Sequence, residues 1–126
     1  MLELVRRWFN ALPQYERDLP LLVVNGVAYT PRAALAEVER GTALGRKLQS
    51  LIETGRFGTP EWTLAKLRLK KMLETMPERP LVATLTLPPR TYTPRELMRE
   101  IERETPVGRQ WIQTEISHMR YLLRLR

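Results

Sequence analysis

Apolar residues recur every three or four positions in several stretches of the chain, the spacing that places them on one face of a helix. The longest of these stretches cover residues 1–12, 59–76 and 106–125, and shorter ones lie at 31–40 and 94–103. Each stretch therefore predicts an amphipathic helix with one buried and one exposed face.

Extended segments precede the two shorter helices. Residues 21–30 place Asn25-Gly26 between apolar runs, which predicts a β-hairpin with a type I′ turn. Residues 83–93 occupy the same place before the second short helix; Thr84 to Leu87 alternate between polar and apolar, and Pro88 stops the strand. We expect this second hairpin to be looser and to lie at an edge. Both sets of strands are expected to pair into one small sheet about a pseudo-two-fold axis.

The chain contains an internal repeat. Residues 29–46 read YTPRAALAEVERGTALGR and residues 92–109 read YTPRELMREIERETPVGR, at a constant offset of 63. Ten of the 18 paired positions are identical, whereas composition alone would give roughly one match. Convergence on a Thr-Pro helix start would explain three of these identities, so we interpret the repeat as a duplicated strand–helix–helix module. The copies cover about 19–54 and 82–117, joined by a linker helix at about 59–76.

Threonine marks each expected helix start within the repeat, because its hydroxyl can accept a hydrogen bond from a free amide of the first turn. These residues are Thr30, Thr42, Thr93 and Thr105. Proline, which fits the first helical position, follows three of the four.

Two helix ends differ from this pattern. Gly41 suits the left-handed end of the first short helix, but the second copy has Glu104 there, so we expect that turn to be made differently or less stably. Between the copies, Thr59 is expected to cap a helix and Pro60 to open it. Together the elements predict an α+β fold in a single domain, residues 1–126, with a small antiparallel sheet and with helices at both termini and between the copies.

Composition limits the chemistry of this 126-residue chain. It has no cysteine and one histidine, which excludes disulfides, thiolate zinc sites and a multi-histidine metal site within one chain. Apolar residues make up 43%, enough for a core, but no run is long enough for a membrane span. The scarcity of asparagine and the absence of cysteine are compatible with a thermophilic source. Arginine outnumbers lysine 17 to 4, but a GC-rich genome would produce the same preference.

Catalytic groups are scarce. Ser50 and Ser117 stand in no nucleophile-elbow pattern, and there is no phosphate-binding loop or dinucleotide glycine signature. His118 adjoins Ser117, but neighbours on a helix point about 100° apart, so we interpret it as a solvated or packing histidine. The sequence therefore predicts a protein that is not an enzyme, with no cofactor, no catalytic residue and no metal site.

Arginine recurs near the expected helix starts, where the helix dipole disfavours cations. Together with adjacent glycines these arginines form a candidate anion or partner site, since helix amides, a closely approached glycine and a guanidinium can bind an anion. The residues are Arg32, Arg46, Arg95, Arg109, Gly45 and Gly108. Alternatively, the arginines bridge the repeat's own glutamates and stabilise the helical pair.

Positive charge is concentrated in the second half of the chain. The net charge is +7; residues 1–63 carry 8 basic and 7 acidic side chains, and residues 64–126 carry 13 and 7. Such basic clusters favour polyanions, although a solvated helix face is the commoner reason for one. The candidate basic patch consists of Lys66, Arg68, Lys70, Lys71, Arg120, Arg124 and Arg126.

Two further interpretations are weaker. The first is that the paired helices form a DNA-reading helix-turn-helix unit. The turn between them is shorter than in that motif, and the helix from Ala43 lacks an array of Asn, Gln, Ser and Arg for reading bases. Arg6, Arg7, Trp8 and Phe9 resemble a membrane-surface helix in outline, but twelve residues of modest charge are more typical of a docking or core helix.

The sequence favours a non-catalytic interaction, adaptor or structural accessory protein of a larger assembly, located in the cytoplasm. The partner is expected to be another protein, and the sequence does not exclude association into a homo-oligomer. The alternative is a basic nucleic-acid-binding or regulatory protein that contacts phosphates through its Arg- and Lys-rich C-terminal half.

Overall fold

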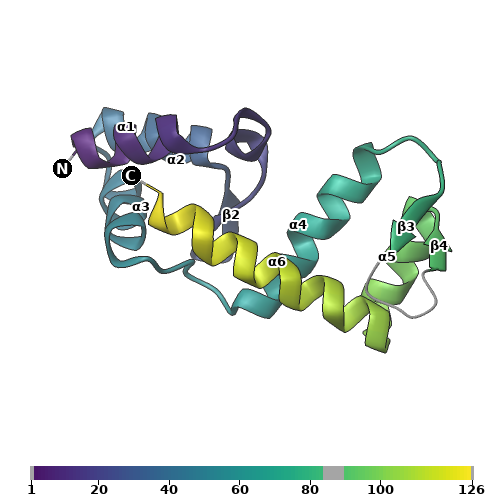
Figure 1. Cartoon of the computed structure of the whole chain (residues 1–126). Coiled ribbons are helices and arrows are strands. Elements are labelled where there is room, and N and C mark those ends of the chain that lie inside the picture. Colours follow the sequence, from purple (N-terminus) through teal and green to yellow (C-terminus); the bar gives the residue numbers. More distant parts are fainter. Residues whose placement is uncertain (1, 84–89, 126) are drawn as a thin grey trace.

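The chain forms a mostly helical α+β fold with short antiparallel strands (Figure 1). The computed structural model describes residues 2–83 and 90–125. In chain order the elements are α1 (Leu2–Ala11), the 3₁₀ helix η1 (Gln14–Asp18), β1 (Leu22–Val24), β2 (Val27–Tyr29), α2 (Pro31–Arg40), α3 (Ala43–Thr54), α4 (Glu61–Thr75), β3 (Leu81–Ala83), β4 (Arg90–Tyr92), α5 (Pro94–Glu102) and α6 (Pro106–Arg124).

Each pair of strands forms its own hairpin. In the first, Leu22 pairs with Tyr29, and the turn residues Asn25 and Gly26 have φ of 53° and 76°, which confirms the predicted type I′ turn. In the second, Leu81 pairs with Tyr92; the predicted strand at 84–87 lies outside the described residues.

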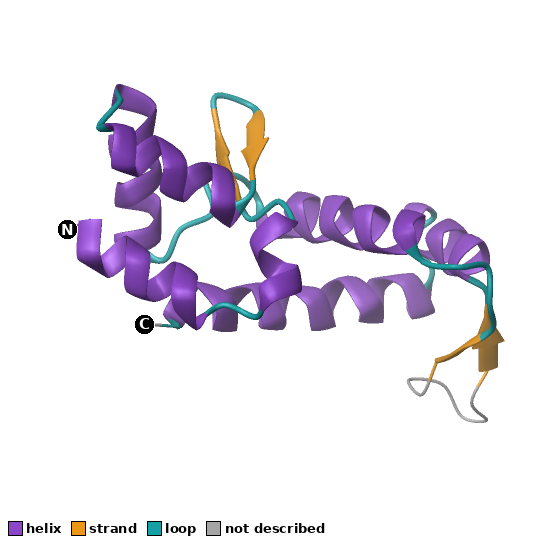
Figure 2. Cartoon of the chain, turned by 90° about the horizontal axis from the view of Figure 1, so that it is seen from above, coloured by secondary structure: helices purple, strands orange, loops and turns teal. Residues whose placement is uncertain are grey.

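The expectation of one shared sheet is wrong for the described residues. The strands form two separate two-stranded sheets, β1-β2 and β3-β4. Figures 1 and 2 show the β3–β4 hairpin at the far end of the molecule, well away from β1–β2. Helices α4, α5 and α6 pack on one another in this half of the chain, so the second hairpin extends from these helices rather than joining the first.

The predicted helix starts within the repeat are confirmed. Thr30 accepts a hydrogen bond from the Ala33 amide at 3.1 Å, and Thr93 forms a full capping box with Glu96. Thr42 and Thr105 cap α3 and α6 through the amides three residues later. For α4 the prediction was wrong by one residue, because Pro60 rather than Thr59 is the N-cap.

The turn between α5 and α6, where we expected a different or less stable turn, has glutamate in place of glycine. Glu104 has a positive φ of 52°, close to the 68° of Gly41, but the C-cap of α5 is Arg103 rather than Glu104. A residue with a side chain accepts this conformation at a cost of about 1–2 kcal/mol. The Lys66 ammonium holds the Glu104 carboxylate at 3.0 Å, which fixes the side chain on α4.

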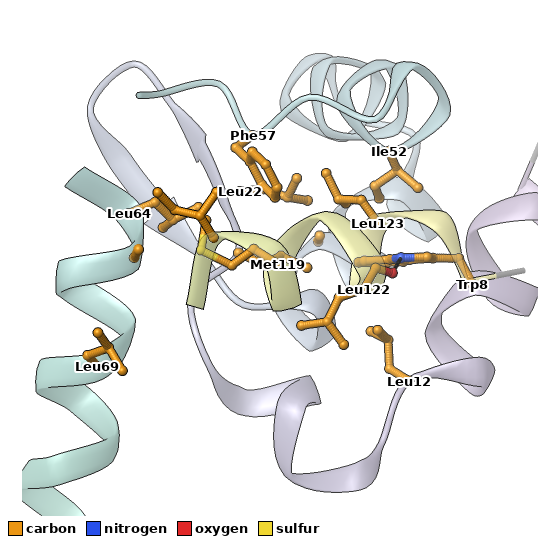
Figure 3. Packing of buried hydrophobic residues seen from close by; sticks show 14 of the residues in the cluster. Trp8, Leu12, Leu22, Ile52, Phe57, Leu64, Leu69, Met119, Leu122 and Leu123 are labelled. Carbon is orange, nitrogen blue, oxygen red and sulfur yellow. Dashed lines mark hydrogen bonds between the residues drawn. The ribbon is translucent and has the colours of Figure 1, made fainter. Parts of the chain in front are cut away.

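The C-terminal half of α6 completes the core of the first half of the chain. Met119, Leu122 and Leu123 are buried beside residues of α1, β1 and the loop before α4 (Figure 3). The indole nitrogen of Trp8 donates to the Leu122 carbonyl at 2.9 Å. Because the N-terminal half of α6 packs on α4 and α5, this one helix connects both halves of a continuous core.

None of the described helices is long and apolar enough to cross a membrane.

Candidate nucleic-acid interface

The outer face of α6 carries cations and neutral polar groups without any acid. The structure describes the whole helix. We call its exposed residues, other than Pro106 at the start, the α6 face. They are Arg109, Gln110, Gln113, Thr114, Ser117, Arg120, Tyr121 and Arg124. At about 100° per residue these side chains fall within an arc of about 140°. The single carboxylate of α6, Glu115, is buried.

The α6 face is long and open. From Arg109 to Arg124 the helix rises about 22 Å, at 1.5 Å per residue. Figure 1 shows α6 in front of the other elements, and Figure 2 shows it along one edge of the molecule. The face is therefore accessible to a large partner along its length.

A buried ionic cluster sets the rotation of α6 about its axis. The Arg68 guanidinium, which is completely buried on α4, donates through Nε to Glu115 Oε1 at 3.0 Å and through Nη1 to the Pro20 carbonyl at 2.8 Å. Its Nη2 donates to the Glu16 carboxylate, which is also bonded to His118 Nε2. Since Glu115 must face Arg68, the opposite side of α6 faces solvent.

This cluster corrects the predicted basic patch. Arg68 was placed there as a surface cation, but it is buried because two carboxylates from α6 and η1 satisfy its charge. His118 is a packing histidine bonded to Glu16 at 3.0 Å. Lys70 and Lys71 are exposed on α4, and Arg126 lies outside the described residues.

Ion pairs modify the charge at both ends of the α6 face. Arg120 binds Glu61 with two hydrogen bonds, of 2.5 and 3.0 Å, and this carboxylate raises the pKa of Arg120. Near the other end, Lys66 and, more weakly, Arg109 hold the pKa of Glu104 below its usual range. Arg109 and Arg124 make no ion pair among the described residues.

The repeated arginines do not gather into one site. Arg32 binds Asp18 at 2.9 Å, lowering the pKa of that carboxyl, and its guanidinium also lies over the Phe9 ring. Arg46 donates to the carbonyl of Gly41 at 3.2 Å. Arg95 is exposed at the start of α5, and Arg109 belongs to the α6 face. The four arginines therefore have different surroundings.

Gly45 and Gly108 approach protein backbone rather than an anion. A Cβ added to Gly45 would lie 2.2 Å from the Glu37 carbonyl oxygen, and one added to Gly108 would lie 2.0 Å from that of Glu100. Each glycine therefore lets the second helix of a pair cross closely over the first. Their amides also donate to the hydroxyls of the capping threonines, so these two amides already have hydrogen-bond partners.

Comparisons with protein-family models, curated proteins and solved structures found no match. Within the described residues there is also no group of three or more acidic or histidine side chains that could hold a metal ion. The α6 face is thus the surface with the most coherent chemistry. Its signal lies in the sequence, where residues 105–126 contain a single acid; sequence reasoning named its three arginines as candidates but did not identify the face that they share.

Proposed function

We propose that the protein is a non-catalytic, cytoplasmic, basic nucleic-acid-binding protein, and that the α6 face binds duplex DNA. The supporting observation is the composition of this face: three arginines, of which Arg120 is paired with Glu61 of α4, two glutamines, a threonine, a serine and a tyrosine, with no acid among the exposed residues of the helix. Guanidinium groups bind phosphates, and amides, hydroxyls and guanidinium groups can hydrogen-bond to base edges. Phosphates would repel a carboxylate on such a face.

Helix geometry favours DNA over duplex RNA. The major groove of B-DNA is wide enough to admit an α-helix, whereas the major groove of A-form RNA is deep and narrow. A helix face of about 22 Å is short enough to lie in a single stretch of the major groove. In this arrangement Gln110 and Gln113 are placed toward base edges, and Arg109 and Arg124 toward the phosphates.

A carboxylate placed on the α6 face tests this proposal. Gln113→Glu is expected to weaken binding to a labelled duplex at least about tenfold at low salt, because the new negative charge enters a groove that is bordered by the phosphates of both strands. Fluorescence anisotropy measures the two dissociation constants.

Ala36→Glu is the matched control, since it adds the same charge at an exposed position of α2 in the first half of the chain. Both variants have a net charge of +6, so long-range attraction is equal and only the position of the carboxylate differs. Equal losses in both variants would contradict a role for the α6 face.

A second candidate is the adaptor or accessory protein that the sequence favours. It is supported by a shallow apolar pocket of about 210 Å³ between η1 and α4, bordered by Tyr15 and Met76, which are 65% and 41% exposed. Co-purification with one protein that persists at high salt and is lost in Met76→Glu would favour this candidate.

We further propose that the two halves derive from one duplicated module with a pseudo-two-fold relation. The support is the ten identical residues in the repeat, together with equivalent caps at Thr42 and Thr105 and equivalent helix crossings at Gly45 and Gly108.

A further inference from the structure

A pocket among the described residues lies at the end of α6, beside the loop that joins α3 to α4. Its volume is about 670 Å³, and it is lined by residues 53–59, Glu61, Arg120, Leu123 and Arg124. We call it the loop pocket. Its size falls within the range of about 300–1,000 Å³ that is typical of small-molecule sites.

The charge that lines the loop pocket is positive. Three guanidinium groups and two carboxylates contribute, and each carboxylate already has a partner: Glu61 binds Arg120, and Glu53 accepts a hydrogen bond from Gln49 at 3.0 Å. Arg56 and Arg124 form no ion pair within the described part of the chain, so their donors are available. An anion would complete their hydrogen bonding.

The helix ends around the pocket do not add to this charge. α4 begins at Glu61 in the pocket wall, so a carboxylate already occupies its first turn. The C-terminal ends of α3 and α6, which carry partial negative charge, also line the pocket. The attraction for an anion therefore comes from the guanidinium groups.

The loop is fixed before any ligand binds. The Phe57 carbonyl accepts the Val23 amide at 2.8 Å, which ties the loop to β1. Gly58 has φ of 82°, and a Cβ there would lie 1.9 Å from the Val23 carbonyl oxygen. Figure 3 shows Phe57 and Leu123 close together in the core, where both are buried and form an apolar floor. Such preorganisation lowers the cost of binding.

We propose that the loop pocket binds the phosphate group of a small phosphorylated ligand. Arg56 and Arg124 bind the phosphate oxygens, and the rest of the ligand occupies the remaining volume against Phe57 and Leu123. A phosphate alone fills only part of about 670 Å³, which favours a ligand of nucleotide size. This inference goes beyond the proposed DNA binding. The two proposals share Arg120 and Arg124, whereas Arg56 lines the pocket and lies outside the α6 face, so a substitution of Arg56 separates them.

Titration with inorganic phosphate, followed by amide NMR without nucleic acid, tests the proposal. We expect saturable shifts at residues 55–59 with a dissociation constant on the order of 1 mM, as for a fragment held by two charged groups. Arg56→Gln is expected to weaken this binding at least about tenfold, because it removes charge-assisted hydrogen bonds.

Lys71→Gln is the matched control, since it removes one charge from an exposed position of α4 outside the pocket lining. Unsaturated shifts, or equal weakening in both variants, would overturn the proposal and leave Arg56 and Arg124 as cations that compensate the C-terminal ends of α3 and α6. If Arg56→Gln also lowered the affinity for duplex DNA, the pocket would be assigned to a DNA phosphate, and the proposal of a small phosphorylated ligand would be overturned. If phosphate does not bind in the pocket but Gln113→Glu still impairs DNA binding, the phosphate proposal is overturned and the proposed DNA-binding function is retained.

Discussion

Replacing Arg68 with methionine is expected to lower the free energy of unfolding by about 3–5 kcal/mol. The substitution leaves Glu16 and Glu115, which are 1% and 7% exposed, without the guanidinium that binds both. An uncompensated charge in a buried site costs far more than the pair itself contributes. Urea denaturation followed by circular dichroism measures the loss.

Two further variants serve as comparisons for this result. Lys71→Met removes a cation from an exposed position of the same helix and is expected to change stability by about 0.5 kcal/mol or less. Arg68→Lys keeps the charge but lacks the planar fork, so it should fall between the wild type and Arg68→Met. A loss below about 1 kcal/mol in Arg68→Met would mean that the cluster contributes no more than an exposed ion pair.

Replacing Gly108 with alanine is expected to lower the free energy of unfolding by about 3 kcal/mol. Helix propensity alone predicts the opposite sign, since alanine is favoured over glycine by about 1 kcal/mol inside a helix. The added Cβ, however, would lie 2.0 Å from the Glu100 carbonyl oxygen, and this contact involves backbone rather than a movable side chain. The helices α5 and α6 must therefore separate, with the cost of overpacking.

Thermal denaturation measures this effect, and a decrease in Tm of about 10 °C corresponds to it for a chain of this size. Ser117→Ala, at an exposed position of the same helix, is the control and should leave Tm nearly unchanged. A higher Tm in Gly108→Ala would show that propensity dominates and that the close crossing is not maintained in solution.

Local features of the fold were predictable because their causes lie within a few residues. The four capping threonines and the Asn25-Gly26 turn each act over two to four positions. Pairing between the hairpins was not predictable, because no local pattern determines which strands meet. The shared sheet was expected from the repeat alone, and the described strands instead form separate hairpins.

The ionic cluster depends on contacts between distant parts of the chain. Arg68 meets Glu16 and Glu115, which are 52 and 47 residues away, so charge counting assigned it to the surface. A local signal was nevertheless present, since Arg68 lies among Leu64, Ala65 and Leu69 on the buried side of α4. The α6 face as a unit was overlooked for a related reason, although its arginines were candidates: its residues are ordinary one by one, and only their shared exposure without an acid is informative.

Binding of the wild-type protein to a labelled DNA duplex at about 50 and 200 mM salt tests the central claim most directly, because phosphate contacts lose affinity steeply over this range. With two to three phosphate contacts from the arginines of the α6 face, the affinity should fall about 10- to 40-fold between these conditions. The protein should also bind duplex DNA more tightly than duplex RNA of the same sequence. Absence of binding at the lower salt, or equal affinity for both duplexes, would contradict the assignment of the α6 face to the DNA major groove.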